Sequence, residues 1–185
     1  MRTRLVAVDI DNTLAEYTAA LRDYVQGNTS LEYPCPDPNL YDFGSQTGWP
    51  WRNKNEFRQT HSDAVQAGLY LTERPYPQAA WALRQLQQNA CRIIIATSRT
   101  DDKNGDTRRW LDIRQIPYDG LFFGDKLDIN ADLWIEDNPN TLSQLENCYL
   151  PAMHPAHEYC RDAYGRTYSE WKDVPQLALD ILSRS

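Results

Sequence analysis

The sequence predicts an α/β protein, in which a parallel sheet lies between two layers of helices and a small helical segment is inserted after the first strand. Apolar runs of strand length alternate with amphipathic segments from residue 77 onward, as in a parallel sheet covered on both faces. Residues 15–74 break that alternation. Polar and charged residues directly follow four of the expected strands. We therefore expect a three-layer α/β/α core with ligand-binding residues along one edge of the sheet.

Composition limits the kinds of protein that this chain can be. With 185 residues, 41% of them hydrophobic, it can form one domain, or one domain with a large insertion. The net charge of −7 argues against long nucleic acid as a partner, because that affinity depends on Lys and Arg at phosphates. A small phosphate ester remains compatible, because a few local cations or a metal can hold it. The phosphate-loop and dinucleotide-binding glycine motifs of kinases and dehydrogenases do not occur.

The sequence also gives expectations about the cellular setting. The longest apolar runs have strand length, so no segment is expected to span a membrane. The N-terminus leads straight into a strand-like run and shows no signal-peptide core. The four cysteines include no C-x-x-C pair. We therefore expect a cytoplasmic protein with reduced, buried thiols.

The first half of the chain contains the first strand and the expected insertion. Residues 5–8 form a continuous apolar run, typical of a buried strand. The spacing of apolar residues predicts helices over 14–26, 53–67 and 77–89. Residues 28–50 are rich in proline and aromatic residues, and long irregular segments of this kind are usually functional or mobile. We interpret residues 15–74 as a cap, and residues 1–14 and 75–185 as the α/β core.

The second half of the chain alternates regularly between strands and helices. The expected strands are residues 91–96, 121–123, 132–135 and 148–152. The expected helices are residues 106–115, 138–146 and 174–182. Asp106 is expected to cap the first of these helices. This regular alternation predicts the parallel order of the core strands.

The residues that follow the strands predict a single site. These residues are Asp9, Asp11 and Thr13 after the first strand, Thr97, Ser98 and Arg99 after the second, Asp125 and Lys126 after the third, and Glu136, Asp137 and Asn138 after the fourth. Each group alone has an ordinary explanation as a helix cap, a turn or a solvated lysine. Because the carboxyl ends of parallel strands meet at one edge, we expect the four groups to converge there.

Three of these carboxylates suggest a metal. Asp9, Asp11 and Asp137 would repel one another at close range, and burial would raise their pKa values. A divalent cation removes that conflict, and oxygen ligands with few carboxylates are typical of Mg²⁺. The Thr97 and Ser98 hydroxyls could bind a phosphate whose charge Lys126 offsets. A carboxylate in line with phosphorus can then act as the nucleophile.

The same residues resemble the motifs of the haloacid dehalogenase superfamily of phosphohydrolases. Residues 9–13 (Asp-Ile-Asp-Asn-Thr) resemble its first motif, residues 96–99 its second, Lys126 its third and residues 134–138 its fourth. The Thr-Ser-Arg, Gly-Asp-Lys and Ile-Glu-Asp-Asn sequences are most similar to the 5′(3′)-deoxyribonucleotidase group and its bacterial nucleotidase-like relatives. The resemblance implies a Rossmann-like fold and a Mg²⁺-dependent phosphomonoesterase that acts on nucleoside monophosphates.

The resemblance also implies a role for each motif residue. Asp9 would be the nucleophile and a metal ligand, and Asp11 the general acid and base, with its backbone carbonyl on Mg²⁺. Thr97 and Ser98 would bind the transferring phosphoryl group, which Lys126 would stabilise. Asp137 would complete the metal site. Glu136 stands where many relatives have aspartate, so its role as a ligand is left open.

The substrate and the alternatives are less sharply predicted. Aromatic side chains of residues 15–74 could stack a nucleobase or could pack the core of the insertion; they are Tyr33, Tyr41, Phe43, Trp49, Trp51 and Phe57. Arg52 and Arg58 could meet a second anionic group or lie on the surface. Cys148, His154, His157 and Cys160 have a spacing that zinc could use, although loop or core positions suit them better. A phosphatase of nucleic-acid ends, or a regulatory module that binds phosphate and Mg²⁺ without turnover, remain as alternatives.

Overall fold

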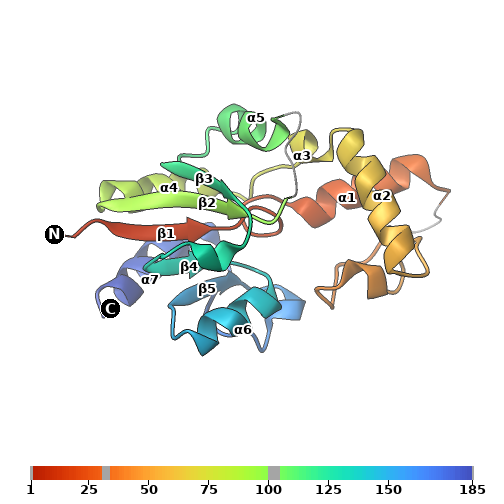
Figure 1. Ribbon diagram of the computed structural model, residues 1–185. Coiled ribbons are helices and arrows are strands. Elements are labelled where there is room, and N and C mark those ends of the chain that lie inside the picture. The colour runs from red at the N-terminus through yellow and green to blue at the C-terminus, as the bar shows by residue number, and fades with distance from the viewer. Residues whose placement is uncertain (1, 31–33, 100–104, 185) are drawn as a thin grey trace.

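The computed structural model describes residues 2–30, 34–99 and 105–184, and its centre is a six-stranded sheet (Figure 1). The strands are β1 (Arg4–Val8), β2 (Cys91–Thr97), β3 (Gly120–Phe123), β4 (Leu133–Ile135), β5 (Ala152–Pro155) and β6 (Arg166–Tyr168). They pair in parallel in the order β3-β2-β1-β4-β5-β6. This is the doubly wound order of Rossmann-like proteins, so the predicted fold class is confirmed.

Helices cover both faces of the sheet. They are α4 (Ala79–Gln88), α5 (Asp106–Ile113), α6 (Pro139–Asn147) and α7 (Val174–Leu182). β1 shows why both faces need cover: Val6 and Val8 belong to the hydrophobic cluster that includes α4 and α7, whereas Ala7 belongs to the cluster that includes α6. Successive side chains of a strand point to opposite faces. Among the described residues, no helix combines the length and apolarity needed to cross a bilayer.

The described part of residues 15–74 contains three further α-helices and a separate hydrophobic cluster. The helices are α1 (Tyr17–Asn28), α2 (Lys54–Gln66) and α3 (Leu69–Thr72). Their cluster is centred on Leu21, Trp49 and Trp51 and is distinct from the two clusters of the sheet. Figure 1 shows these helices beyond the carboxyl ends of the strands, with both chain termini at the opposite end of the molecule.

The two ends of this inserted segment are held together where they leave the core. The Glu16 N–H donates to the Arg74 carbonyl at 2.8 Å, and the Tyr76 N–H donates to the Leu14 carbonyl at 2.9 Å. Ala15 and Pro75 form an antiparallel bridge between them. The segment is therefore joined to the core by two short antiparallel stretches rather than by long linkers.

The predicted elements differ from the observed ones mostly at their ends. Asn53 and Asn138 cap α2 and α6 with their side chains, and Pro139 is the first residue of α6, as its fixed φ favours. The first helix begins three residues later than predicted, at Tyr17, because Leu14 belongs to the loop that follows β1. α5 is preceded by Gly105 in a left-handed conformation, so Asp106 is its first residue rather than its cap.

The last part of the sheet was predicted incorrectly. The predicted strand at 148–152 is displaced, because Cys148 ends α6 and β5 begins only at Ala152. The apolar run Tyr-Leu-Pro contains Tyr149 in a left-handed turn, and its side chain is exposed. The short strand β6 was not predicted at all. Its three residues, Arg-Thr-Tyr, give no alternating pattern long enough to indicate a strand.

Candidate active site

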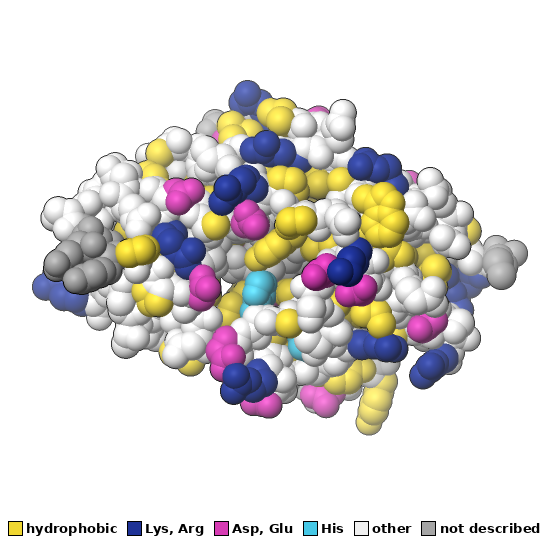
Figure 2. Space-filling model, turned by 180° about the vertical axis from the view of Figure 1, so that it is seen from behind, with side chains coloured by type: hydrophobic (Ala, Val, Ile, Leu, Met, Phe, Trp, Pro, Cys, Tyr) yellow, Lys and Arg dark blue, Asp and Glu magenta, His cyan; other side chains and the backbone are white. Residues whose placement is uncertain are grey.

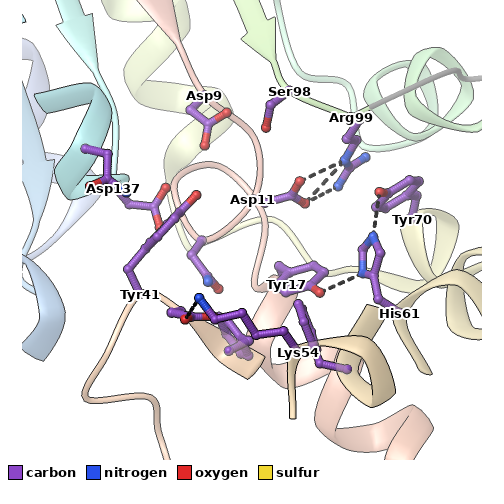
Figure 3. Close-up of a pocket in the computed structure, with 15 residues that line it drawn as sticks. Asp9, Asp11, Tyr17, Tyr41, Lys54, His61, Tyr70, Ser98, Arg99 and Asp137 are labelled. Carbon is purple, nitrogen blue, oxygen red and sulfur yellow. Dashed lines mark hydrogen bonds and ion pairs between the residues drawn. The ribbon is translucent and has the colours of Figure 1, made fainter. Parts of the chain in front are cut away.

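A cavity of about 560 Å³ lies between the carboxyl ends of the strands and the inserted segment (Figure 3). Asp9, Asp11, Ser98, Arg99 and Asp137 line it from the core. The opposite wall comes mainly from residues of the insertion, among them Tyr17, Tyr41, Phe43, Lys54, Phe57, His61 and Tyr70. The cavity thus has a charged floor and a largely aromatic roof, and its size suits a ligand the size of a nucleotide.

The loop after β1 places two of the carboxylates. The N–H groups of Leu14 and Ala15 both donate to the Ile10 carbonyl, so the chain turns back within five residues. Asn12 takes a left-handed conformation with φ of 57°, which asparagine tolerates better than most residues. Its side-chain oxygen accepts from the Thr18 N–H and hydroxyl at 3.0 and 2.9 Å. The turn therefore anchors α1 and directs Asp9 and Asp11 into the cavity.

Three buried carboxylates and one lysine form a cluster at the floor of the cavity, which Asp9 and Asp137 line directly. Ligand atoms of Asp9, Glu136 and Asp137 all lie within 4.8 Å of one another. The Lys126 Nζ donates to Asp9 Oδ1 and to Glu136 Oε2, both at 2.6 Å. Burial alone would lower the pKa of Lys126, but these two carboxylates raise it above its ordinary value. Lys126 is therefore a fixed cation, and it leaves two negative charges uncompensated when all three carboxyl groups are ionised.

The close approach of these carboxyl groups changes their pKa values. Burial, followed by the charge of Asp9, raises the pKa of Glu136 to about 7. Burial and the charges of Asp9 and Glu136 also raise the pKa of Asp137. Close carboxylates in a medium of low polarity favour protonation unless a cation compensates them.

The donor set fits a hard divalent cation. Oxygen ligands alone, buried and within reach of one ion, are typical of Mg²⁺ rather than of zinc, and the two uncompensated charges equal those of the ion. Asp137 is also well oriented: the Tyr159 hydroxyl donates to its Oδ2 at 2.6 Å and the Thr13 hydroxyl to its Oδ1 at 3.3 Å. The Cys160 thiol donates to its backbone carbonyl at 3.0 Å. Such contacts commonly orient the ligands of a metal.

The residues after β2 occupy different environments. Ser98 is exposed and lines the cavity. Thr97 is fully buried, and its hydroxyl accepts a hydrogen bond from the Arg99 N–H at 3.2 Å. The Arg99 guanidinium donates to Asp11 and to Glu73. Burial, more than the nearby charge of Asp11, raises the pKa of Glu73 to about 8, against the lowering effect of Arg99.

The aromatic residues of the insertion divide into two groups. Trp49 and Trp51 are buried and stack on each other with centroids 5.0 Å apart, so they pack the hydrophobic cluster of the insertion. Tyr41, Phe43 and Phe57 line the cavity. Tyr33 lies outside the described residues.

A hydrogen-bonded row of polar side chains lies beside these rings. The Tyr17 hydroxyl is 2.8 Å from His61 Nδ1, and the Tyr70 hydroxyl is 3.4 Å from His61 Nε2. Figure 3 shows this row next to Asp11 and Arg99. Burial lowers the pKa of His61, so the ring is neutral and can both donate and accept.

The basic residue that the insertion contributes to the cavity lining is neither of the two arginines considered from the sequence. Arg52 is exposed and pairs with Glu56 at 2.9 Å, and Arg58 is also exposed. Lys54, at the start of α2, lines the cavity instead and pairs with Asp42 at 2.6 Å. The sequence could not separate these three residues, because the residue at which α2 begins and the rotation of the helix decide which of them faces the cavity.

A second cavity, of about 540 Å³, lies behind the loop that follows β1 and includes Thr13, His157 and Trp171 in its lining. Figure 2 shows the molecule from this side, with a histidine in a hollow of the surface. The ring N–H of His157 donates to the Asn12 carbonyl at 2.7 Å, and Trp171 Nε1 donates to the Thr13 carbonyl at 3.0 Å. Both side chains therefore support the loop that follows β1 through its backbone carbonyls.

These contacts leave no support for the zinc alternative. In the part of the chain that the structure describes, the only group of three potential metal ligands is Asp9, Glu136 and Asp137. Cys148 is exposed at the end of α6, whereas Cys160 is buried beside Asp137. Sequence proximity alone suggested the set Cys148, His154, His157 and Cys160.

Comparisons with known proteins agree with the geometry. A sequence model of the family described as "5′ nucleotidase, deoxy (Pyrimidine), cytosolic type C protein" matches residues 3–184. The "Putative 5′(3′)-deoxyribonucleotidase" of Chlorobaculum tepidum is 28% identical over 179 residues, which cover 92% of this chain and 87% of that protein.

Solved structures share the fold at low sequence identity. A haloacid dehalogenase-like family hydrolase from Streptococcus pneumoniae superposes with a TM-score of 0.66 at 14% identity, over 96% of this chain and 98% of the other. A structure titled "predicted phosphatase" from Clostridium acetobutylicum gives a TM-score of 0.68 at 14% identity, over 97% and 100% of the two chains. These likenesses confirm the haloacid dehalogenase-like fold.

The match to the nucleotidase family sets aside a regulatory module without turnover. It covers both the strand-end residues and the inserted segment that faces them. The chain therefore belongs to the type C 5′-nucleotidase family and is a phosphatase of the haloacid dehalogenase-like fold.

Proposed function

We propose that this phosphatase is a Mg²⁺-dependent 5′-nucleotidase that hydrolyses (deoxy)nucleoside monophosphates through an aspartyl-phosphate on Asp9. The observation that carries the proposal is the position of Asp9, which lines the cavity and contacts Lys126 while belonging to the acidic cluster. A nucleophile at this position would have the Lys126 cation beside it and carboxylates nearby that could bind a metal cation. The family of the chain and the name of its Chlorobaculum tepidum relative support the choice of nucleotides.

The chemistry follows from the two aspartates of the loop after β1. A carboxylate oxygen of Asp9 attacks phosphorus, and the bond from phosphorus to the ester oxygen breaks as Asp11 gives its proton to that oxygen. A water molecule then attacks the phosphorus of the aspartyl-phosphate while Asp11 takes one of its protons. The bond between phosphorus and Asp9 breaks, which releases inorganic phosphate and restores both side chains.

The other residues at the floor would stabilise the charge of the phosphoryl group. Lys126 lies against Asp9 and would offset the negative charge that develops on the phosphoryl oxygens. Ser98 faces the cavity and would donate its hydroxyl to the same group. Thr97 would also contribute to phosphate binding. Its hydroxyl accepts from the Arg99 N–H and so stabilises the turn that carries Ser98.

Asp9, Asp137 and the backbone carbonyl of Asp11 would hold Mg²⁺, with Glu136 beside them. When bound, Mg²⁺ supplies charge stabilisation to the phosphoryl oxygens. The accumulated negative charge at Asp9, Glu136 and Asp137 supports this assignment. Lys126 compensates only part of that charge.

Residues 15–74 would act as a cap that excludes water and binds the nucleoside. Phe57 and Tyr41 line the cavity with aromatic rings, on which a base could stack. The Tyr17–His61–Tyr70 row offers hydrogen bonds to polar atoms of the nucleoside. The buried free thiols of Cys35, Cys91 and Cys160 support a reducing, cytoplasmic setting.

A panel of substrates tests the proposal. The protein, supplied with Mg²⁺, is assayed for phosphate release from nucleoside 5′- and 3′-monophosphates, sugar phosphates and a 5′-phosphorylated oligonucleotide. We expect the highest kcat/KM with a nucleoside monophosphate. A higher value with the oligonucleotide would instead favour a phosphatase of nucleic-acid ends.

A further inference from the structure

Arg99 is a buried cation that grips the carboxylate of Asp11 from the side. Its side chain is only 1% exposed, whereas that of Asp11 is 30% exposed. Nη2 donates to Asp11 Oδ1 at 2.6 Å, and Nε lies 3.3 and 3.2 Å from the two carboxylate oxygens. A guanidinium that donates through two nitrogens fixes a carboxylate in orientation as well as in position.

Arg99 is itself held by groups that lie outside the loop after β1. Nη2 also donates to Glu73 Oε2 at 2.5 Å, and Glu73 is fully buried at the end of α3. The guanidinium carbon lies 3.7 Å from the ring centroid of Tyr70, and Nη1 donates to the Thr107 hydroxyl at 3.4 Å. Each nitrogen of the guanidinium group thus has a partner, and two of the contacting residues, Tyr70 and Glu73, belong to the insertion.

Glu73 connects this arrangement to the point where the insertion returns to the core. Its carbonyl accepts from Trp110 Nε1 at 2.9 Å, which attaches the chain to α5. The next residue, Arg74, belongs to the antiparallel pair that closes the insertion. Glu73 therefore has a fixed position relative to the sheet, and its contact with Arg99 transmits that position to Asp11.

We propose that Arg99 is a positioning residue that fixes the carboxyl group of Asp11 for its two proton transfers and is itself oriented by Glu73 and Tyr70. This inference rests on the proposed function, because it assigns those transfers to Asp11. A displacement of about 1 Å in such a group can cost about 100-fold in rate. The residue does not touch the phosphoryl group in this account; it acts through Asp11.

The test separates the two chemical steps by the choice of leaving group. 4-Nitrophenyl phosphate releases an anion that hardly needs a proton, whereas a nucleoside 5′-monophosphate releases an alkoxide that does. With Arg99→Gln, we expect the nitrophenolate burst to keep its rate within about threefold, because Asp9 is intact. We expect steady-state kcat to fall about 30-fold or more with both substrates, because general acid–base catalysis contributes about 10²–10⁴.

Two further variants define the role of the guanidinium and of its support. Arg99→Lys keeps the charge but loses the two-nitrogen grip, so we expect only partial recovery of kcat. Glu73→Leu keeps a side chain of similar volume but removes the oxygen that accepts from Arg99 Nη2, so we expect a fall of about three- to tenfold in kcat with little change in KM. Arg4→Lys is the matched control, because Arg4 pairs with Asp132 at 3.3 Å at the opposite end of β1, and it should leave both steps unchanged.

Two results would overturn the inference. One is a burst that slows as much as steady-state turnover in Arg99→Gln and Arg99→Lys, and the other is unchanged kcat in both Arg99→Lys and Glu73→Leu. Thermal unfolding of each variant identifies any loss of fold. If the Arg99 variants do not fold, unchanged kcat in Glu73→Leu is by itself enough to overturn the inference. Failure of the proposed function would give a different result. The Asp9→Asn variant would then show the same nitrophenolate burst as the wild-type protein.

Discussion

Asp9 and Lys126 lie 117 positions apart in the sequence, yet their charged atoms meet at 2.6 Å at the floor of the cavity. Lys126 also contacts Glu136 at the same distance. One lysine thus holds together residues that follow β1 and β4, the strands on either side of the point where the strand order reverses. Ligands of open α/β sheets bind at that point, and here the chain has concentrated its buried charge there.

Mg²⁺ is expected to bind the acidic cluster and to stabilise the fold. Glu136 and Asp137 have raised pKa values without a cation, so an ion relieves unfavourable charge as it binds. We expect millimolar Mg²⁺ to raise the midpoint of thermal unfolding and EDTA to abolish turnover, which added Mg²⁺ restores. Asp137→Asn should lose most of the stabilisation. Turnover that ignores chelation would contradict the metal site.

The metal affinity should rise with pH. Because the folded protein holds Glu136 at a pKa of about 7, Mg²⁺ must displace a proton below that pH. Calorimetric titrations between pH 6 and 8 should therefore show tighter binding at the higher pH. Proton release, measured in buffers of different ionisation enthalpy, should decrease over the same interval. An affinity that does not depend on pH would show that Glu136 is already ionised.

The stability of the metal-free protein should change with pH in the opposite sense. Glu73 and Glu136 have folded-state pKa values of about 8 and about 7, above the ordinary value for glutamate. The folded state therefore binds more protons than the unfolded state, and the stabilisation is complete below about pH 4.5. It is lost as the pH rises through 7 and 8. Urea unfolding in EDTA should show this decline, and Glu73→Gln should make it smaller.

Phe57 is expected to contribute to the binding of a base. Its ring lines the cavity and packs against Trp51 with a centroid separation of 5.0 Å. Phe57→Leu should raise KM for a nucleoside monophosphate about tenfold, because base stacking is worth about 1–3 kcal/mol, and should change KM for glycerol phosphate little. Arg58→Ala, on the same helix and exposed, is the control. Equal effects on both substrates would remove Phe57 from base binding.

The absence of a side chain at Gly44 is expected to be necessary for the close approach of Lys54. A Cβ at Gly44 would lie 2.8 Å from the Cα and Cγ of Lys54, so the backbone of α2 would have to move. Gly44→Ala should destabilise the protein by about 1–3 kcal/mol. Gly27→Ala is the matched control: nothing lies within 4 Å of its Cβ position in α1, and alanine should stabilise a helix there by about 0.5–1 kcal/mol. Chemical unfolding of both variants measures the difference.

The sequence was sufficient to predict the four strands β1 to β4 and the residues that follow them, because both depend on local pattern. Continuous apolar runs marked β1 and β2, and the residues that followed them converge as expected at Asp9 and Ser98. β6 was missed because three residues carry no periodicity. Cys148 was misplaced because an apolar turn resembles a strand.

The supporting contacts could not be predicted, because they join positions that are distant in the sequence. Nothing in the sequence around Tyr159 indicates that its hydroxyl reaches Asp137, or that Glu73 reaches Arg99. Arg99 was visible only as the residue after Thr97 and Ser98. Arg99 is buried although it lies just after a strand end, and this burial is visible only in the fold. Burial is what allows Arg99 to hold Asp11.

The most direct test of the proposed mechanism is to identify the residue that becomes phosphorylated during turnover. The protein is mixed with Mg²⁺ and 4-nitrophenyl phosphate, quenched in acid during the burst, digested and analysed by mass spectrometry. We expect a phosphoryl group on Asp9 of the wild-type protein, and neither a phosphoryl group nor turnover in Asp9→Asn. Rapid hydrolysis by the Asp9→Asn variant, or a phosphoryl group on another residue, would contradict the mechanism.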